Sequence, residues 1–189
     1  MSDLVERHRT ACDGFARVAA LVPEGGWQRP TPCTDWDARA LVEHVIGFHE
    51  FLLLRPLGVR ANRPREGSAA RWRATQDALF GALDAPGALD HATQLPGGGE
   101  STPRTMLPAL TTDVLVHTWD LARATGVDPA LDPALCARAH DAARAAGVGG
   151  ATDMFAAEAP VADDAPAADR LVACYGRDPA WLPPVSPGS

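Results

Sequence analysis

Apolar residues recur at steps of three and four along most of this 189-residue chain, and no long segment alternates apolar with polar residues. Steps of three and four place side chains on one face of an α-helix, whereas a half-buried strand needs alternation. The pattern and its flanking Pro, Gly and capping residues predict helices over 3–22, 35–54, 68–83 and 105–125. Before the second of these helices, Thr34 and Asp37 resemble a capping box with Thr34 as the N-cap. The sequence therefore predicts an all-α helical bundle, with one short strand near 93–95.

The C-terminal part of the chain adds two further helices. Asp132 and Pro133 form an N-cap and N1 pair, and Gly147 ends the helix that they begin. Residues 148–189 are acidic and rich in Pro and Ala, with one short helix predicted over 169–174. Because 189 residues with 46% hydrophobic content suit one core, we expect a single domain, 1–189, with its tail packed on the bundle.

The charge of the chain narrows the classes of partner. A net charge of −7 argues against a nucleic-acid partner, which normally needs a basic patch. All 17 basic residues are Arg, so Schiff-base chemistry on lysine is excluded.

The start of the chain has no apolar signal region and no later run reaches the length of a membrane span, so we expect a cytoplasmic protein without a membrane partner. No stripe of residues decides between a monomer and a homodimer.

Three residues form a candidate metal site. Asp113 and His117 are four apart on one predicted helix and therefore share a face, while His44 lies on the inner face of another. Two imidazoles and one carboxylate are typical of reactive divalent metal sites with open coordination positions. The alternative is a buried hydrogen bond between Asp113 and His117 without an ion. Among the other histidines, His49 is predicted to point away from this inner face, and His8 to be a partly exposed or packing residue.

Three further residues could support the site. Asp120 follows His117 by three positions, so it could accept the proton of the free ring nitrogen or pair with Arg123 on the surface. Trp36 and Trp119 could line the wall of a pocket or anchor the core. No residue is assigned a direct catalytic role from the sequence.

Two long motifs and the C-terminal end carry a resemblance to a known family. They read RPTPCTDWDARALVEHV at 29–45, DVLVHTWDLARATG at 113–126 and YGRDPAW at 175–181. The chain resembles actinobacterial DinB-like metal-binding proteins and, more narrowly, is similar to the N-terminal domain of mycothiol-dependent maleylpyruvate isomerase. The resemblance implies a four-helix bundle, a divalent metal that is commonly zinc, and ligand positions at His44, Asp113 and His117. Nickel, manganese and iron remain open as the metal.

The resemblance also implies a class of reaction. We expect a metal-dependent enzyme of the mycothiol-dependent transferase or isomerase type, with a low-molecular-weight thiol as cosubstrate and a small electrophile as substrate. A metal-bound thiol is deprotonated at neutral pH, which makes it a nucleophile. Two alternatives stay open: a thiol-independent tailoring enzyme of secondary metabolism, acting as a cyclase or hydrolase, and a non-catalytic protein that binds a small ligand.

Overall fold

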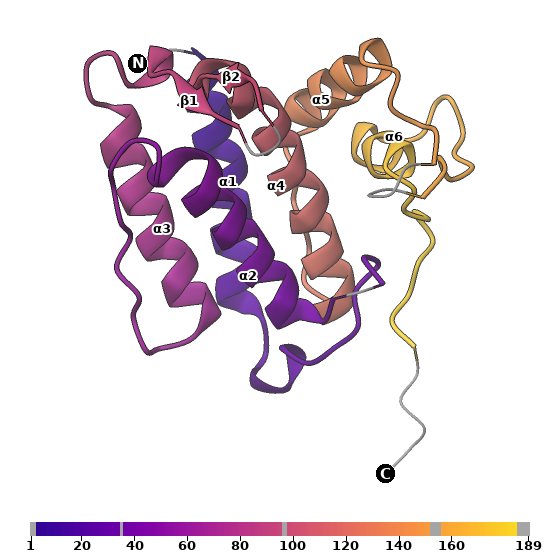
Figure 1. Cartoon of the computed structure of the whole chain (residues 1–189). Helices are drawn as coiled ribbons and strands as arrows, with labels where there is room; N and C mark the ends of the chain where they lie inside the picture. The colour runs from indigo at the N-terminus through magenta and orange to yellow at the C-terminus, as the bar shows by residue number, and fades with distance from the viewer. Residues whose placement is uncertain (1–2, 35, 96–97, 152–155, 185–189) are drawn as a thin grey trace.

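The computed structural model describes residues 3–34, 36–95, 98–151 and 156–184, and its regular structure is mostly helical. The bundle consists of α1 (Asp3–Leu21), α2 (Ala38–His49), α3 (Ser68–Leu83) and α4 (Pro103–Thr125). Both α1 and α2 pack against α3 and α4, so α1 and α2 lie diagonally across the bundle, with α2 in front of α1 in Figure 1. This is the all-α, DinB-like architecture that the sequence predicts.

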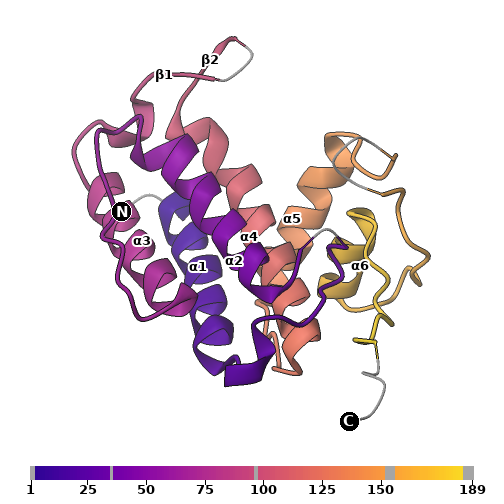
Figure 2. The same cartoon turned by 60° about the horizontal axis from the view of Figure 1, so that its bottom comes forward.

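The helix α4 is covered on two sides. α1 and α2 pack on one side of it, while α5 (Pro133–Ala145) and α6 (Ala167–Cys174) lie on the other, as Figure 2 shows. Seventeen of its 23 residues are buried, and these include polar and ionisable ones. Its buried threonine hydroxyls are satisfied locally, since each donates to a carbonyl oxygen one turn back; these are Thr111, Thr112, Thr118 and Thr125. Polar side chains of α4 therefore lie inside the fold.

The helix α2 differs from the prediction only at its N-terminal end. It begins at Ala38, three residues late, because Asp37 rather than Thr34 acts as its N-cap. The Asp37 carboxylate accepts a hydrogen bond of 2.8 Å from the backbone N–H three residues on. After His49 the helix continues as one π-helical turn, Glu50–Leu54, so the helical segment as a whole ends where the sequence predicts.

The other boundaries follow local chemistry. α3 has the predicted limits, while α4 begins two residues early because Thr102 and Thr105 cap each other reciprocally. Gly126 ends α4 in the left-handed conformation (φ 75°) that glycine adopts without strain. The predicted short strand is β1 (Thr93–Gln94), which pairs with the antiparallel β2 (Glu100–Ser101).

The C-terminal part of the chain packs beside the bundle. α6 begins two residues before the predicted short helix and contacts both α5 and α4. The chain after α6 then brings Arg177 to Asp120 of α4. The parts of the predicted tail at 152–155 and 185–189 lie outside the described residues. Within the described ranges, no helix combines the length and apolar character that crossing a membrane requires.

Candidate metal centre

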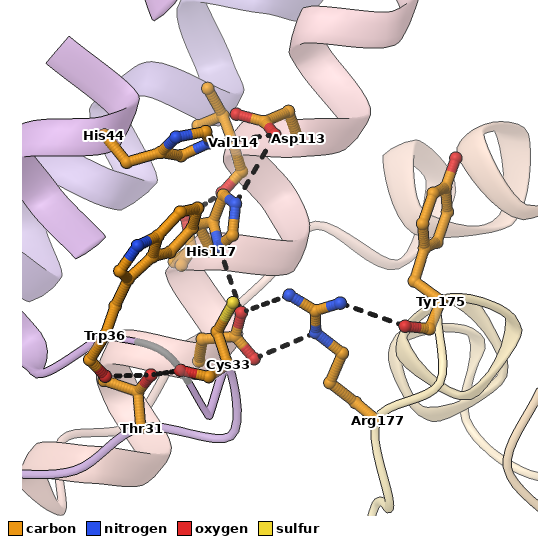
Figure 3. A network of polar contacts seen from close by, with 11 residues as sticks. Thr31, Cys33, Trp36, His44, Asp113, Val114, His117, Tyr175 and Arg177 are labelled. Carbon is orange, nitrogen blue, oxygen red and sulfur yellow. Dashed lines mark hydrogen bonds and ion pairs between the residues drawn. The ribbon is translucent and has the colours of Figure 1, made fainter. Parts of the chain in front are cut away.

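Two neighbouring helices bring together the three side chains that the sequence singles out. α4 carries Asp113 and His117 one turn apart, and α2, which packs against it, carries His44. The Nε2 atoms of His117 and His44 lie 3.4 Å and 3.8 Å from Asp113 Oδ1, and the two imidazole rings meet edge to face (Figure 3). One carboxylate and two imidazole nitrogens therefore converge on one point of the bundle.

A buried hydrogen-bond chain orients the His117 ring from behind. Its Nδ1 donates to Asp120 Oδ2 at 3.0 Å, since a carboxylate can only accept. Arg177 in turn donates to both oxygens of Asp120, from Nη2 at 2.9 Å and from Nε at 3.3 Å. With its Nδ1 committed to Asp120, His117 directs Nε2 at Asp113, the arrangement typical of a metal-ligating histidine.

The electrostatics of the site favour a positive charge beside Asp113. Burial alone would raise the pKa of Asp113, but hydrogen bonds and positive charge from His117 and His44 outweigh burial and hold this pKa far below its usual range. Burial alone would lower the pKa of His117, but Asp113 and Asp120 outweigh it and raise this pKa to about 9. Without a metal, a proton on Nε2 of His117 therefore supplies the positive charge at neutral pH.

The residues present fit a divalent cation. Asp113 Oδ2 is buried and has no hydrogen-bond partner among the described residues. Leaving a buried carboxylate oxygen unsatisfied is costly, and a cation at this point would satisfy it. One carboxylate and two imidazole nitrogens are also a ligand set that zinc and related divalent ions accept. The assignment of His44, Asp113 and His117 as ligands stays a prediction.

Aromatic side chains flank one side of the cluster. Trp36 stacks on His44 with ring centroids 4.2 Å apart, and Phe48, one turn further along α2, lies 4.7 Å from the same ring. Phe48 is 38% exposed, so the outer edge of this aromatic group is open to solvent. Trp119 is only 1% exposed and lies in the core, with the guanidinium group of Arg123 over its ring.

Arg177 is not among the site residues that the sequence predicts. Arg123 is the predicted ionic partner of Asp120, but it donates to the carbonyl oxygen of Pro179 instead. Arg177 is separated from Asp120 by 57 positions, and no spacing rule connects two residues that far apart. Its only signal was its place in the motif at 175–181.

Two other histidines are more buried than the sequence suggests. His49 is predicted to point away from the inner face of its helix, and this prediction is wrong, because its side chain is fully buried against Trp72 and His8. A position five residues after His44 lies about 140° around the helix, and here that side of α2 faces the interior of the bundle. His8, predicted to be either partly exposed or a packing residue, is fully buried and stacks on His49, so it is a packing residue.

Known proteins identify the family. The family described as mycothiol maleylpyruvate isomerase N-terminal domain matches residues 8–122, a range that contains His44, Asp113 and His117. The chain belongs to this family. Two uncharacterized proteins of Mycobacterium tuberculosis, from strains CDC 1551 / Oshkosh and H37Rv, are each 37% identical to it over 182 residues, which is 93% of this chain and 98% of theirs. No solved structure matches the chain. The family is mycothiol-related, DinB-like and metal-binding.

The pKa of His117 predicts how metal binding depends on pH. His117 must lose its Nε2 proton to bind a cation, and the pKa of about 9 means that this proton is present at pH 7. We expect the apparent affinity for Zn²⁺ to rise about tenfold per pH unit between pH 7 and 8.5, with about one proton released per ion. Calorimetric titration in two buffers of different ionisation enthalpy measures this release. Proton release near zero at pH 7.5 would contradict the prediction.

Proposed function

We propose that the protein is a divalent-metal-dependent enzyme of the mycothiol-dependent transferase or isomerase type. The observation that carries the proposal is the convergence of Asp113, His117 and His44, with one buried oxygen of Asp113 left without a partner. Membership of a mycothiol-related family supports a small thiol as the cosubstrate.

The three residues would hold the cation, with zinc as the first expectation and nickel, manganese or iron as others. A bound divalent cation lowers the pKa of a coordinated thiol and holds the thiolate close to an electrophile. The side chains of His44 and Asp113 are 20% and 21% exposed, whereas that of His117 is 7% exposed. The thiol would therefore enter from the side of His44 and Asp113.

The surrounding residues divide into those that orient and those that contact substrate. Asp120 and Arg177 hold the His117 ring in place from the buried side. Trp36 and Phe48 offer an apolar surface beside His44, suited to the carbon skeleton of an electrophile. In a transfer, the thiol loses its proton to solvent, a sulfur–carbon bond forms, and the bond from that carbon to chloride or to the epoxide oxygen breaks, so that chloride leaves or the ring opens to an alcohol that takes up a proton. In an isomerisation, the same bond forms and then breaks, and the thiol is regenerated.

Thiol consumption by the zinc-loaded protein tests this function. The probes are mycothiol with a chloronitroaromatic compound and with an epoxide, while isomerisation is followed with maleylpyruvate. We expect at least one reaction to run about 100-fold faster with the parent than with His44→Ala, because loss of the cation removes several kcal/mol of stabilisation. His91→Ala, which changes an exposed histidine outside the cluster, should match the parent.

Binding of mycothiol provides a readout that needs no electrophile. Calorimetry should show that mycothiol binds to the zinc-loaded parent and much more weakly to the metal-free protein. Absence of binding to the zinc-loaded parent would overturn the role of the thiol. Turnover of a substrate without any thiol would instead favour a tailoring enzyme, and tight binding of a small ligand without turnover would favour a binding protein.

A further inference from the structure

A second cluster of ligand-type side chains lies in the core of the bundle, away from solvent. His8 and Cys12 are one turn apart on α1, and His49 ends α2, the helix diagonally opposite. All three side chains have an exposed fraction of 0%. His8 Nε2 lies 3.2 Å from His49 Nε2 and 3.5 Å from Cys12 Sγ, and the three ligand atoms are within 4.8 Å of one another.

The hydrogen bonds of the cluster fix the tautomers of both histidines. His49 Nδ1 lies 2.7 Å from the carbonyl oxygen of Val45, which can only accept, so Nδ1 carries a hydrogen. His8 Nδ1 lies 3.0 Å from Thr111 Oγ1. The hydroxyl of Thr111 donates its only hydrogen to the carbonyl oxygen of Leu107 at 2.7 Å, so it must accept from His8.

This assignment leaves two neutral imidazoles with their Nε2 lone pairs facing each other at 3.2 Å. The single hydrogen of the Cys12 thiol can satisfy only one of them. A proton shared between the rings would place an imidazolium in the core, next to the aromatic rings of Trp72 and Phe80. Burial opposes that charge, since it lowers the pKa of both His8 and His49.

We propose that His8, Cys12 and His49 form a second metal site, one that takes a thiophilic cation, Zn²⁺ or Cu⁺. Bonds of about 2.0–2.1 Å to nitrogen and about 2.3 Å to sulfur at tetrahedral angles separate two nitrogens by about 3.4 Å and a nitrogen from a sulfur by about 3.6 Å. The observed separations of 3.2 Å and 3.5 Å are close to these values. A cation at this point would accept both lone pairs and the sulfur at once.

The ligand set and the burial indicate the kind of site. A thiolate with two imidazoles favours zinc or cuprous ion over the harder ions that prefer oxygen ligands. On binding, the thiol of Cys12 gives up its proton and the cation takes its place, which compensates the thiolate charge. Since no ligand is exposed, the site is closed to solvent and links α1 to α2 across the bundle. The inference is independent of the proposed enzymatic function.

Cobalt substitution tests the site. The double variant His44→Ala/His117→Ala removes two ligands of the first metal centre, so any metal that still binds must occupy a different site. We expect this variant to bind one equivalent of Co²⁺ with an intense near-ultraviolet band from sulfur-to-metal charge transfer. Adding Cys12→Ala should abolish the band. Cys33→Ser is the matched control, because Cys33 is drawn near His117 in Figure 3 rather than in the core cluster, and it should leave the band unchanged.

A second measurement keeps the test decisive if Cys12→Ala fails to fold. X-ray absorption of the zinc-loaded His44→Ala/His117→Ala variant should show one sulfur at about 2.3 Å from the ion. Excess Zn²⁺ or Cu⁺ should raise its melting temperature by about 5–10 °C, and the larger rise identifies the preferred cation. No bound metal, no sulfur scatterer and no thermal shift with either cation would overturn the proposal in favour of a metal-free histidine pair.

Discussion

The variant His117→Ala is expected to lose the zinc that the parent holds at the first centre. Losing one of three ligands should weaken zinc binding by about 3–4 kcal/mol, which is two to three powers of ten in Kd. The loss should be large because His117 is the ligand whose ring is held in place, by Asp120 and, through it, by Arg177. Competition for Zn²⁺ with a chromophoric chelator measures the affinity, and metal analysis after dialysis measures occupancy.

The core cluster of His8, Cys12 and His49 could also bind zinc, so the zinc content of His117→Ala must be compared with that of a control variant. His91→Ala should retain the full metal content of the parent, since His91 is exposed and lies outside both clusters. If the core site also binds zinc, His117→Ala should keep one equivalent while the parent holds two. Equal zinc content and equal affinity in the parent and His117→Ala would contradict the assignment of His117 as a ligand.

Replacing Arg177 with methionine is expected to destabilise the fold by about 3–5 kcal/mol. Asp120 is completely buried, and Arg177 supplies two of its charge-assisted hydrogen bonds. Methionine keeps much of the aliphatic bulk but leaves Asp120 as a buried carboxylate that, among the described residues, retains a hydrogen bond from His117 and none from a guanidinium group. Urea unfolding monitored by circular dichroism measures the change. Because His117 would be less firmly oriented, zinc affinity should also fall by about 10- to 100-fold.

Two comparisons isolate the effect of burial. Arg104 forms a similar two-bond pair with Asp90 on the surface, and Arg104→Met should cause a much smaller change because solvent already screens that pair. Adding Asp120→Asn to Arg177→Met removes the unpaired charge but keeps an acceptor for His117, so it should restore more than half of the lost stability. Equal destabilisation by Arg177→Met and Arg104→Met would contradict the prediction, because the buried pair would then contribute no more to the free energy of unfolding than the exposed pair.

The fold was largely predictable because helices depend on local signals. The spacing of apolar residues, the Asp132 N-cap and the C-terminal Gly126 act over a few positions and can be recognised along the chain. The incorrect helix boundary also depends on local signals. Thr34 and Asp37 are both good N-cap residues, and only the path of the preceding segment decides that Asp37 caps α2.

The candidate metal centre was predictable in part. Asp113 and His117 share a helix face by spacing alone, and His44 lay on a predicted inner face. That α2 and α4 are neighbours, so that the three side chains meet, follows from packing that the sequence does not display. The stacking of Trp36 on His44 and the burial of Trp119 likewise depend on packing between segments, which spacing along the chain does not reveal.

The helices, the net negative charge and the residue types able to hold a metal can be predicted from the chain alone, because these depend on composition and on spacing within one element. Which helix faces are covered depends instead on how the helices pack together. The tertiary structure joins Arg177 to Asp120 across 57 positions and brings His49 to His8 across the bundle diagonal. Contacts between distant segments arise when whole helices pack to bury their apolar faces. The spacing of residues shows which face of a helix is apolar, but it does not show which other helix covers that face.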